Sequence, residues 1–222
     1  MRHVFREPFS GLSHLLAAFA AIAGLCILTI NATLYGNIWH ITSFAIFGAS
    51  MFLLFMASAM YHLLPVSEQA QKAWKRIDHM MIFVLIAGSY TPFCLVVLRD
   101  GVGWTLFTVI WGLAIAGILM KIFWIHAPRW LSTLIYVGMG WMAIFAIGPL
   151  RQNLTEGALF WLIAGAGCYT VGAVIYGTKW PNPYPEHFGF HEIWHLFVIG
   201  GAFCHFWAIA FHLVGPSTLI AG

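Results

Sequence analysis

The chain has 222 residues, of which 61% are hydrophobic and 8% are charged, and its formal net charge is +3. Because soluble domains carry about 25% charged residues, this composition and a mean hydropathy of +0.87 exclude an ordinary soluble domain. The Lys and Arg residues lie in short segments between apolar runs, so the positive charge indicates membrane topology and gives no reason to expect a nucleic-acid partner.

Long apolar runs recur along the chain, and each approaches the roughly 20 residues that a helix needs to cross a bilayer. The runs do not alternate between apolar and polar residues, which favours helices over the strands of a membrane barrel. We therefore predict an all-α membrane protein, a seven-transmembrane helix bundle. It forms a single integral membrane domain over residues 1–222, with spans at about 12–30, 38–64, 78–98, 104–124, 131–150, 157–177 and 190–214.

The distribution of Lys and Arg predicts the orientation of this bundle. With the N-terminus inside, eight of these residues lie on the inner side, and only Arg99 and Arg151 lie on the outer side. An excess of Lys and Arg marks the cytoplasmic side of membrane proteins. We therefore expect a cytoplasmic N-terminus and, with seven spans, a C-terminus outside.

Ionisable residues are unevenly distributed among the spans. The fifth and sixth spans contain none, and the fourth contains only Lys121, near its inner end, where we expect it to snorkel. Ionisable groups inside membrane spans are costly and indicate functional sites. The predicted topology places several of them at one depth near the cytoplasmic face: Glu7, His14, His62, Asp78, His191 and His195.

His191 and His195 are four residues apart, so a helix presents both on one face. Catalytic Zn²⁺ sites use three protein ligands and one water, and His62 is the best third ligand at this depth. Ser58 lies one turn before His62, and Asp78 is placed to contact the metal water or an imidazole. We predict a Zn²⁺ site with ligands His62, His191 and His195 and with catalytic roles for Asp78 and Ser58. The alternative is a hydrogen-bonded polar cluster that stabilises the bundle without a metal.

Four further residues are candidates for supporting roles around the ligands: Glu7, His14, His79 and Glu192. Glu192 is the acidic residue of a His-Glu-x-x-His sequence, which in metalloproteases supplies the general base. No Asp or Glu follows Glu192, so the downstream acidic ligand of such proteases is missing, and a protease is the weaker alternative. His205 lies 14 residues beyond His191, about 21 Å along a helix, so we expect it to bond to a neighbouring helix or an interface group instead of the metal.

These motifs together resemble the hemolysin III branch of the progestin and adipoQ receptor (PAQR) family over nearly the whole chain. The resemblance is carried by Glu7-Pro-Phe-Ser10 with His14, by Ser58-x-x-x-His62, by Arg76-Ile-Asp78-His79, by the segment 87–93, and by His191-x-x-x-His195. Ser10 stands where the family usually has Asn. The resemblance implies a seven-helix bundle, Zn²⁺ held by the three histidines, and a location in the cytoplasmic membrane of a bacterium.

The leading functional hypothesis is a zinc-dependent lipid hydrolase, similar to a ceramidase, that cleaves an amide or ester of a membrane lipid near the inner leaflet. The expected partners are membrane lipids and a lipid-like small-molecule substrate. Two alternatives remain: a cytolysin, as the family name implies, and a non-enzymatic membrane sensor in which zinc is structural, with Glu192 or His79 as a fourth ligand. The sequence predicts no oligomeric state.

Overall fold

The computed structural model describes residues 6–124 and 126–214. Within them the chain forms seven helical spans that are long and apolar enough to cross a membrane, which confirms the predicted fold class. The elements are α1 (Pro8–Tyr35), α2 (Ile38–Leu63), α3 (Glu68–Pro92) with the π-helical η1 (Phe93–Val97), α4 (Gly103–Phe123), α5 (Arg129–Trp141) with the 3₁₀ segment η2 (Met142–Ala146) and α6 (Ile147–Asn153), α7 (Glu156–Thr178) and α8 (Phe190–His212).

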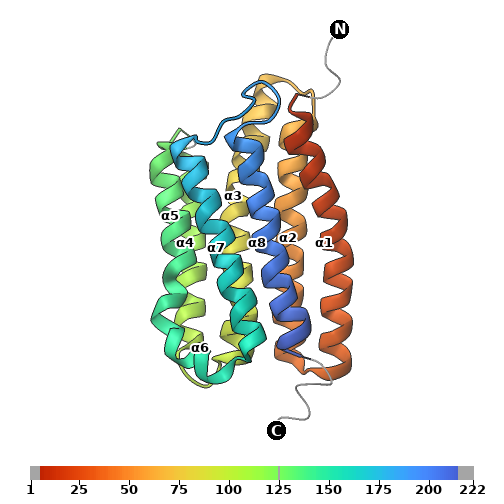
Figure 1. Ribbon diagram of the computed structural model, residues 1–222, viewed down its shortest axis with the longest axis vertical. Helices are drawn as coiled ribbons and strands as arrows, with labels where there is room; N and C mark the ends of the chain where they lie inside the picture. The colour runs from red at the N-terminus through yellow and green to blue at the C-terminus, as the bar shows by residue number, and fades with distance from the viewer. Residues whose placement is uncertain (1–5, 125, 215–222) are drawn as a thin grey trace.

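The spans form a closed ring in chain order. Each packs against the next, α5 packs against α7, and α8 returns to pack against α1 (Figure 1). α1 begins and α8 ends at opposite ends of the bundle, as an odd number of spans requires. The C-terminal end of α2 and the N-terminal ends of α1, α3 and α8 therefore lie at the same end, where the predicted site residues are concentrated.

Several helices extend beyond the apolar windows from which they were predicted. α3 begins at Glu68, ten residues before the predicted span, and Ser67 caps it by accepting a hydrogen bond from the Ala70 N–H at 3.4 Å. Asp78 therefore lies three turns inside a helix and does not open it. The charged first turns of α3 carry no hydropathy signal, which explains the difference. α1 likewise begins at Pro8 and continues to Tyr35.

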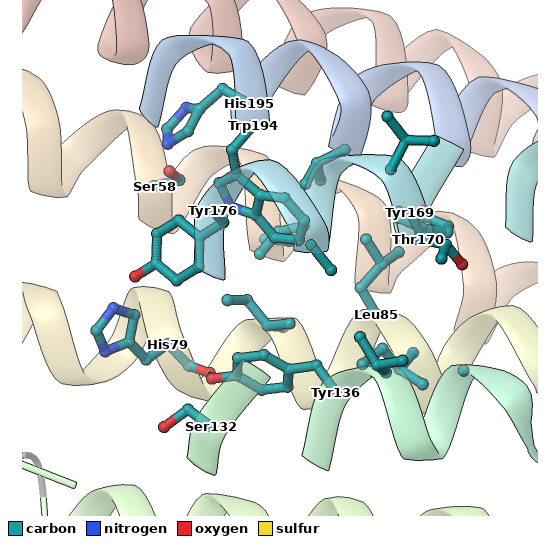
Figure 2. Close-up of a pocket in the computed structure, with 18 of the residues that line it drawn as sticks. Ser58, His79, Leu85, Ser132, Tyr136, Tyr169, Thr170, Tyr176, Trp194 and His195 are labelled. Carbon is teal, nitrogen blue, oxygen red and sulfur yellow. The ribbon is translucent and has the colours of Figure 1, made fainter. Parts of the chain in front are cut away.

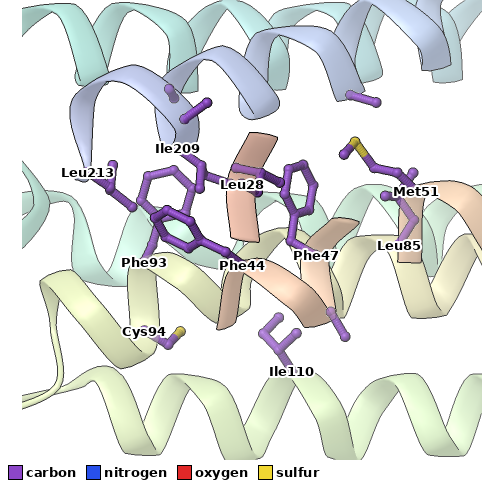
Figure 3. Packing of buried hydrophobic residues seen from close by; sticks show 14 of the residues in the cluster. Leu28, Phe44, Phe47, Met51, Leu85, Phe93, Cys94, Ile110, Ile209 and Leu213 are labelled. Atoms are coloured by element: carbon purple, nitrogen blue, oxygen red, sulfur yellow. The ribbon is translucent and has the colours of Figure 1, made fainter. Parts of the chain in front are cut away.

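The apolar core lies mainly between α1, α2, α3 and α8, in the half of the bundle away from the histidines. Phe44 and Phe47 of α2 are fully buried and pack near Leu28 of α1 and Ile209 of α8 (Figure 3). α2, α3 and α8 bury half or more of their apolar windows, whereas α4, α5–α6 and α7 bury less than a third. The second group therefore presents more of its surface to lipid, and the first forms the more buried side of the bundle.

The fifth span is interrupted between α5 and α6, and a tyrosine from α3 forms hydrogen bonds with the backbone groups at the interruption. The hydroxyl of Tyr90 lies 2.9 Å from the carbonyl oxygen of Met139 and 2.6 Å from that of Gly140. The same hydroxyl accepts a hydrogen bond from the Ala143 N–H at 2.9 Å. Lipid offers no partner to free backbone groups, so such a break is stable only where another part of the protein supplies one.

We predict that Tyr90→Phe lowers the free energy of unfolding by about 1–3 kcal/mol, because it leaves buried backbone groups without a partner. The measurement is thermal unfolding of the purified protein in detergent. Tyr35→Phe is the matched control, because Tyr35 is 40% exposed at the end of α1. Equal unfolding temperatures for Tyr90→Phe and the wild-type protein would contradict the assigned role.

Candidate metal centre

Three histidines from two helices converge at the end of the bundle where α8 begins. Among the described residues, His62, His191 and His195 form a set whose ligand atoms all lie within 4.8 Å of one another. The ring centroids are 5.2 Å apart for His62 and His191, 4.8 Å for His62 and His195, and 4.7 Å for His191 and His195. This arrangement is compatible with a bound metal ion.

The ring nitrogens of this set also suit shared coordination. The Nε2 atoms of His191 and His195 are 3.1 Å apart, and two imidazoles on one tetrahedral Zn²⁺ would have nitrogens about 3.3 Å apart. Nε2 of His62 is buried without a hydrogen-bond partner in the described residues. A buried, unpaired ring nitrogen is costly, and a metal ion held by the three histidines would satisfy this one.

The N-terminal end of α1 fixes the orientation of His62. The Nδ1–H of His62 donates a hydrogen bond to the Glu7 carboxylate, and the Glu7 N–H donates to the His62 carbonyl at 3.2 Å. The hydrogen bond to His62 lowers the pKa of Glu7, although burial opposes the shift. Gly11 lets α1 approach α2 this closely, because a Cβ there would clash with the Leu63 side chain. Nδ1 is thereby held by Glu7, and Nε2 faces the other histidines.

Glu192 joins the first turn of α1 to the start of α8. Its Oε2 accepts a hydrogen bond from the Gly189 N–H at 2.8 Å, which caps the start of α8. Its Oε1 accepts a hydrogen bond from the Ser10 hydroxyl at 2.9 Å. Both carboxylate oxygens therefore have partners, and Ser10 has a structural contact with α8.

His14 and His205 occupy different positions relative to the cluster. The His14 ring stacks on His195 with centroids 3.9 Å apart, so it contacts a candidate ligand directly. His205 lies deeper in α8, packed edge-on against Tyr169 at 5.5 Å. His205 therefore lies against the neighbouring helix α7, away from the candidate ligands.

The cluster opens into a large cavity inside the ring of helices. Its volume is about 1630 Å³, and all three candidate ligands line it. Asp78 and Ser58 are buried and line the same space, as does His79. Figure 2 shows Ser58 and His195 on one side of this space and His79 on another. The predicted ligands and the predicted catalytic residues thus share one cavity.

The far wall of the cavity comes from spans that the sequence analysis left without a role. Tyr136 of α5 and Tyr176 of α7 line it, and the Tyr136 hydroxyl donates to the His79 carbonyl at 3.2 Å (Figure 2). Lys121 of α4 does not snorkel: it is 2% exposed, and its Nζ donates to the Ser132 hydroxyl at 2.5 Å. The sequence does carry a signal for this wall. Tyr136 and Tyr176 are hydroxyl-bearing residues near the inner ends of spans that are otherwise apolar.

We predict that Glu7→Gln weakens metal binding by about 10- to 100-fold, because the variant loses the anionic acceptor that orients His62. Competition with a chelator of known affinity measures this change. Glu68→Gln is the control, because Glu68 is exposed in the first turn of α3. Unchanged metal affinity in Glu7→Gln would show that the hydrogen bond to His62 does not support the ligand.

Comparison with known proteins gives one consistent result. The profile of the family described as Haemolysin-III related matches residues 2–206. The chain is 40% identical over 216 residues to Hemolysin-3 of Bacillus cereus, covering 97% of this chain and 95% of that protein. It is 38% identical over 208 residues to the Hemolysin-3 homolog of Bacillus subtilis, covering 94% of each. The human Monocyte to macrophage differentiation factor is 25% identical over 214 residues, covering 93% of this chain and 84% of that protein.

Proposed function

The chain belongs to the haemolysin-III related family, and we propose that it is a zinc-dependent hydrolase that cleaves an amide or ester bond of a membrane lipid. The observation that carries the proposal is the opening of a three-histidine cluster into a large cavity within a membrane-spanning bundle. Three protein ligands are the number that catalytic zinc sites use, since the fourth position must stay available for water or substrate.

The shape and lining of the cavity favour a lipid substrate. Below the histidines the lining becomes apolar and includes Leu85, Phe93, Leu98 and Leu106. His205, about 15 Å beyond His195 along α8, lines the same space. An acyl chain fits a long apolar cavity of this kind, whereas a small polar substrate would leave most of it unfilled.

Zinc held by the three histidines would supply a Lewis acid that activates water and polarises a carbonyl group. The protein side chains would supply the proton transfers. The Asp78 carboxylate is buried beside this space and is the candidate general base, which accepts the proton from the attacking water. The Ser58 hydroxyl is the candidate donor to the substrate oxygen on which negative charge develops.

Metalloprotease chemistry is less well supported. In that chemistry the acidic residue of the His-Glu-x-x-His sequence serves as the general base. Glu192 instead caps α8 and accepts a hydrogen bond from Ser10, so both of its oxygens already have structural partners. Among the described residues, Asp78 is the buried acidic residue that lines the cavity, which makes it the better candidate for the base.

The proposed location is the cytoplasmic membrane of a bacterium, with the histidine end of the bundle toward the inner leaflet. The positive-inside rule supports this orientation, because Arg99 and Arg151 are the only Lys or Arg residues at the opposite end of the described helices. The cleaved bond would then lie near the depth where acyl chains join the headgroup.

We predict that Asp78→Asn retains zinc and lowers lipid turnover by about 10²- to 10⁴-fold, because it removes the general base and keeps the shape of the side chain. His195→Ala is expected to lose both zinc and turnover. The measurements are zinc content by elemental analysis and product formation from lipid amides and esters by mass spectrometry.

His205→Ala serves as the control for zinc content, because His205 lies away from the ligand set and is expected to leave it intact. Full turnover in His195→Ala would overturn the hydrolase proposal. Release of haemoglobin from erythrocytes by the purified protein, undiminished in His195→Ala, would favour a cytolysin instead.

A further inference from the structure

Lys121 is a buried cation without an acidic partner. It is 2% exposed near the end of α4 and lines the cavity, yet no carboxylate of the described residues lies within ion-pair distance of it. Ser132 is its hydrogen-bond partner there, and an ammonium group has three N–H donors. A buried ammonium is costly unless an anion or further acceptors satisfy it, so the cavity wall at Lys121 lacks a negative group.

The carboxylates of the cavity lie elsewhere or are already engaged. Glu7 is hydrogen-bonded to His62, and Glu192 is hydrogen-bonded to Gly189 and Ser10. These residues lie on α1, on α2 or at the start of α8. Asp78 is buried in α3 among the groups around the histidine cluster, and Glu186 is exposed in the loop before α8. Glu7, Glu192 and the three candidate ligands therefore lie on the α1–α2–α8 side of the cavity, whereas Lys121 of α4 lies across it, beside Ser132 and on the side of His79 (Figure 2).

Two further cations line the cavity from the helices beside Lys121. Lys75 lies near the start of α3, and Arg129 is the first residue of α5. The Arg129 guanidinium lies over the Tyr176 ring at 4.8 Å and the Phe190 ring at 5.4 Å. No carboxylate of the described residues is within ion-pair distance of Arg129, so its N–H donors remain available to an anion. Three helices thus each contribute one cation to the same end of the cavity.

We infer that this cationic wall, formed by Lys75, Lys121 and Arg129, binds the phosphate of a lipid headgroup. Basic pockets between transmembrane helices bind anionic headgroups in this way, and Arg and Lys are the usual ligands of phosphate. The phosphate occupies the α3–α4–α5 side of the cavity, the carbonyl group of the same lipid faces the histidines, and the acyl chain extends along Leu98 and Leu106. The inference rests on the proposed function only in naming its substrate, because headgroup binding requires no catalysis.

A phosphate near an acyl carbonyl is characteristic of a glycerophospholipid. A neutral sphingoid amide or a neutral glyceride offers Lys121 only uncharged acceptors and no anion to balance its charge. The cationic wall therefore selects among the lipid amides and esters of the proposed function, and it favours phosphate-bearing esters.

The test compares two probes that share an acyl ester and differ only in phosphate, mono-oleoyl phosphatidate and mono-oleoyl glycerol. Their affinities for the full chain in neutral detergent are measured by native mass spectrometry, with inorganic phosphate as a third arm. We expect the wild-type protein to bind the phosphatidate about tenfold tighter than the glyceride or more. Lys121→Met should abolish this preference, and Lys121→Arg should retain it.

Lys72→Met is the matched control, because Lys72 is an exposed lysine of α3 that does not line this cavity. If Lys121→Met fails to fold, Lys75→Met replaces it, since Lys75 is exposed at the cavity mouth, and a partial loss of the preference is expected. Equal affinity of the wild-type protein for the two probes would overturn the inference. So would an undiminished preference in Lys121→Met or, where it replaces that variant, in Lys75→Met.

Competition by inorganic phosphate at the same concentration as the phosphatidate would indicate a site for free phosphate and would also overturn the lipid assignment. His195→Ala separates this inference from the proposed function. Retention of the phosphate preference in His195→Ala, together with loss of turnover, is the expected result. A wild-type protein with the preference and no hydrolysis would refute the proposed function alone.

Discussion

Contacts between the first turn of α1 and two other helices determine the geometry of the histidine cluster. Glu7 holds the ring of His62 on α2, and Ser10 holds Glu192 at the start of α8. Lipid supplies no hydrogen-bond partners, so polar side chains buried at this end of the bundle must be satisfied within the protein. With Glu7 bonded to His62 of α2 and Glu192 of α8 bonded to Ser10 of α1, the ligand atoms of the three histidines lie within 4.8 Å of one another beside an open cavity.

Much of this arrangement could be predicted from the sequence, because hydropathy, charge distribution and helical spacing are local properties. Seven apolar runs give the number of spans, and alternation of span direction brings the end of α2 and the starts of α3 and α8 to one depth. The four-residue spacing of His191 and His195 then predicts two imidazoles on one face. The structure brings these two residues and His62 together.

Other features depend on contacts between distant segments, which no local pattern encodes. The early start of α3 at Glu68 lies outside the apolar window, and the break in the fifth span is stable because Tyr90 of α3 reaches it. Lys121 was expected to snorkel, but the packing of α5 against α4 buries it beside Ser132. The cavity itself is a property of the closed ring, so its wall from α5 and α7 could not be derived from the ionisable residues alone.

The central claim is a zinc ion with three histidine ligands and one position open to the cavity. X-ray absorption spectroscopy at the zinc edge of the purified protein tests this claim most directly. The account predicts three imidazole nitrogens at about 2.0–2.1 Å and one oxygen donor that a soluble zinc-binding inhibitor displaces. A zinc-free protein, or a shell of four protein ligands that no inhibitor alters, would contradict it.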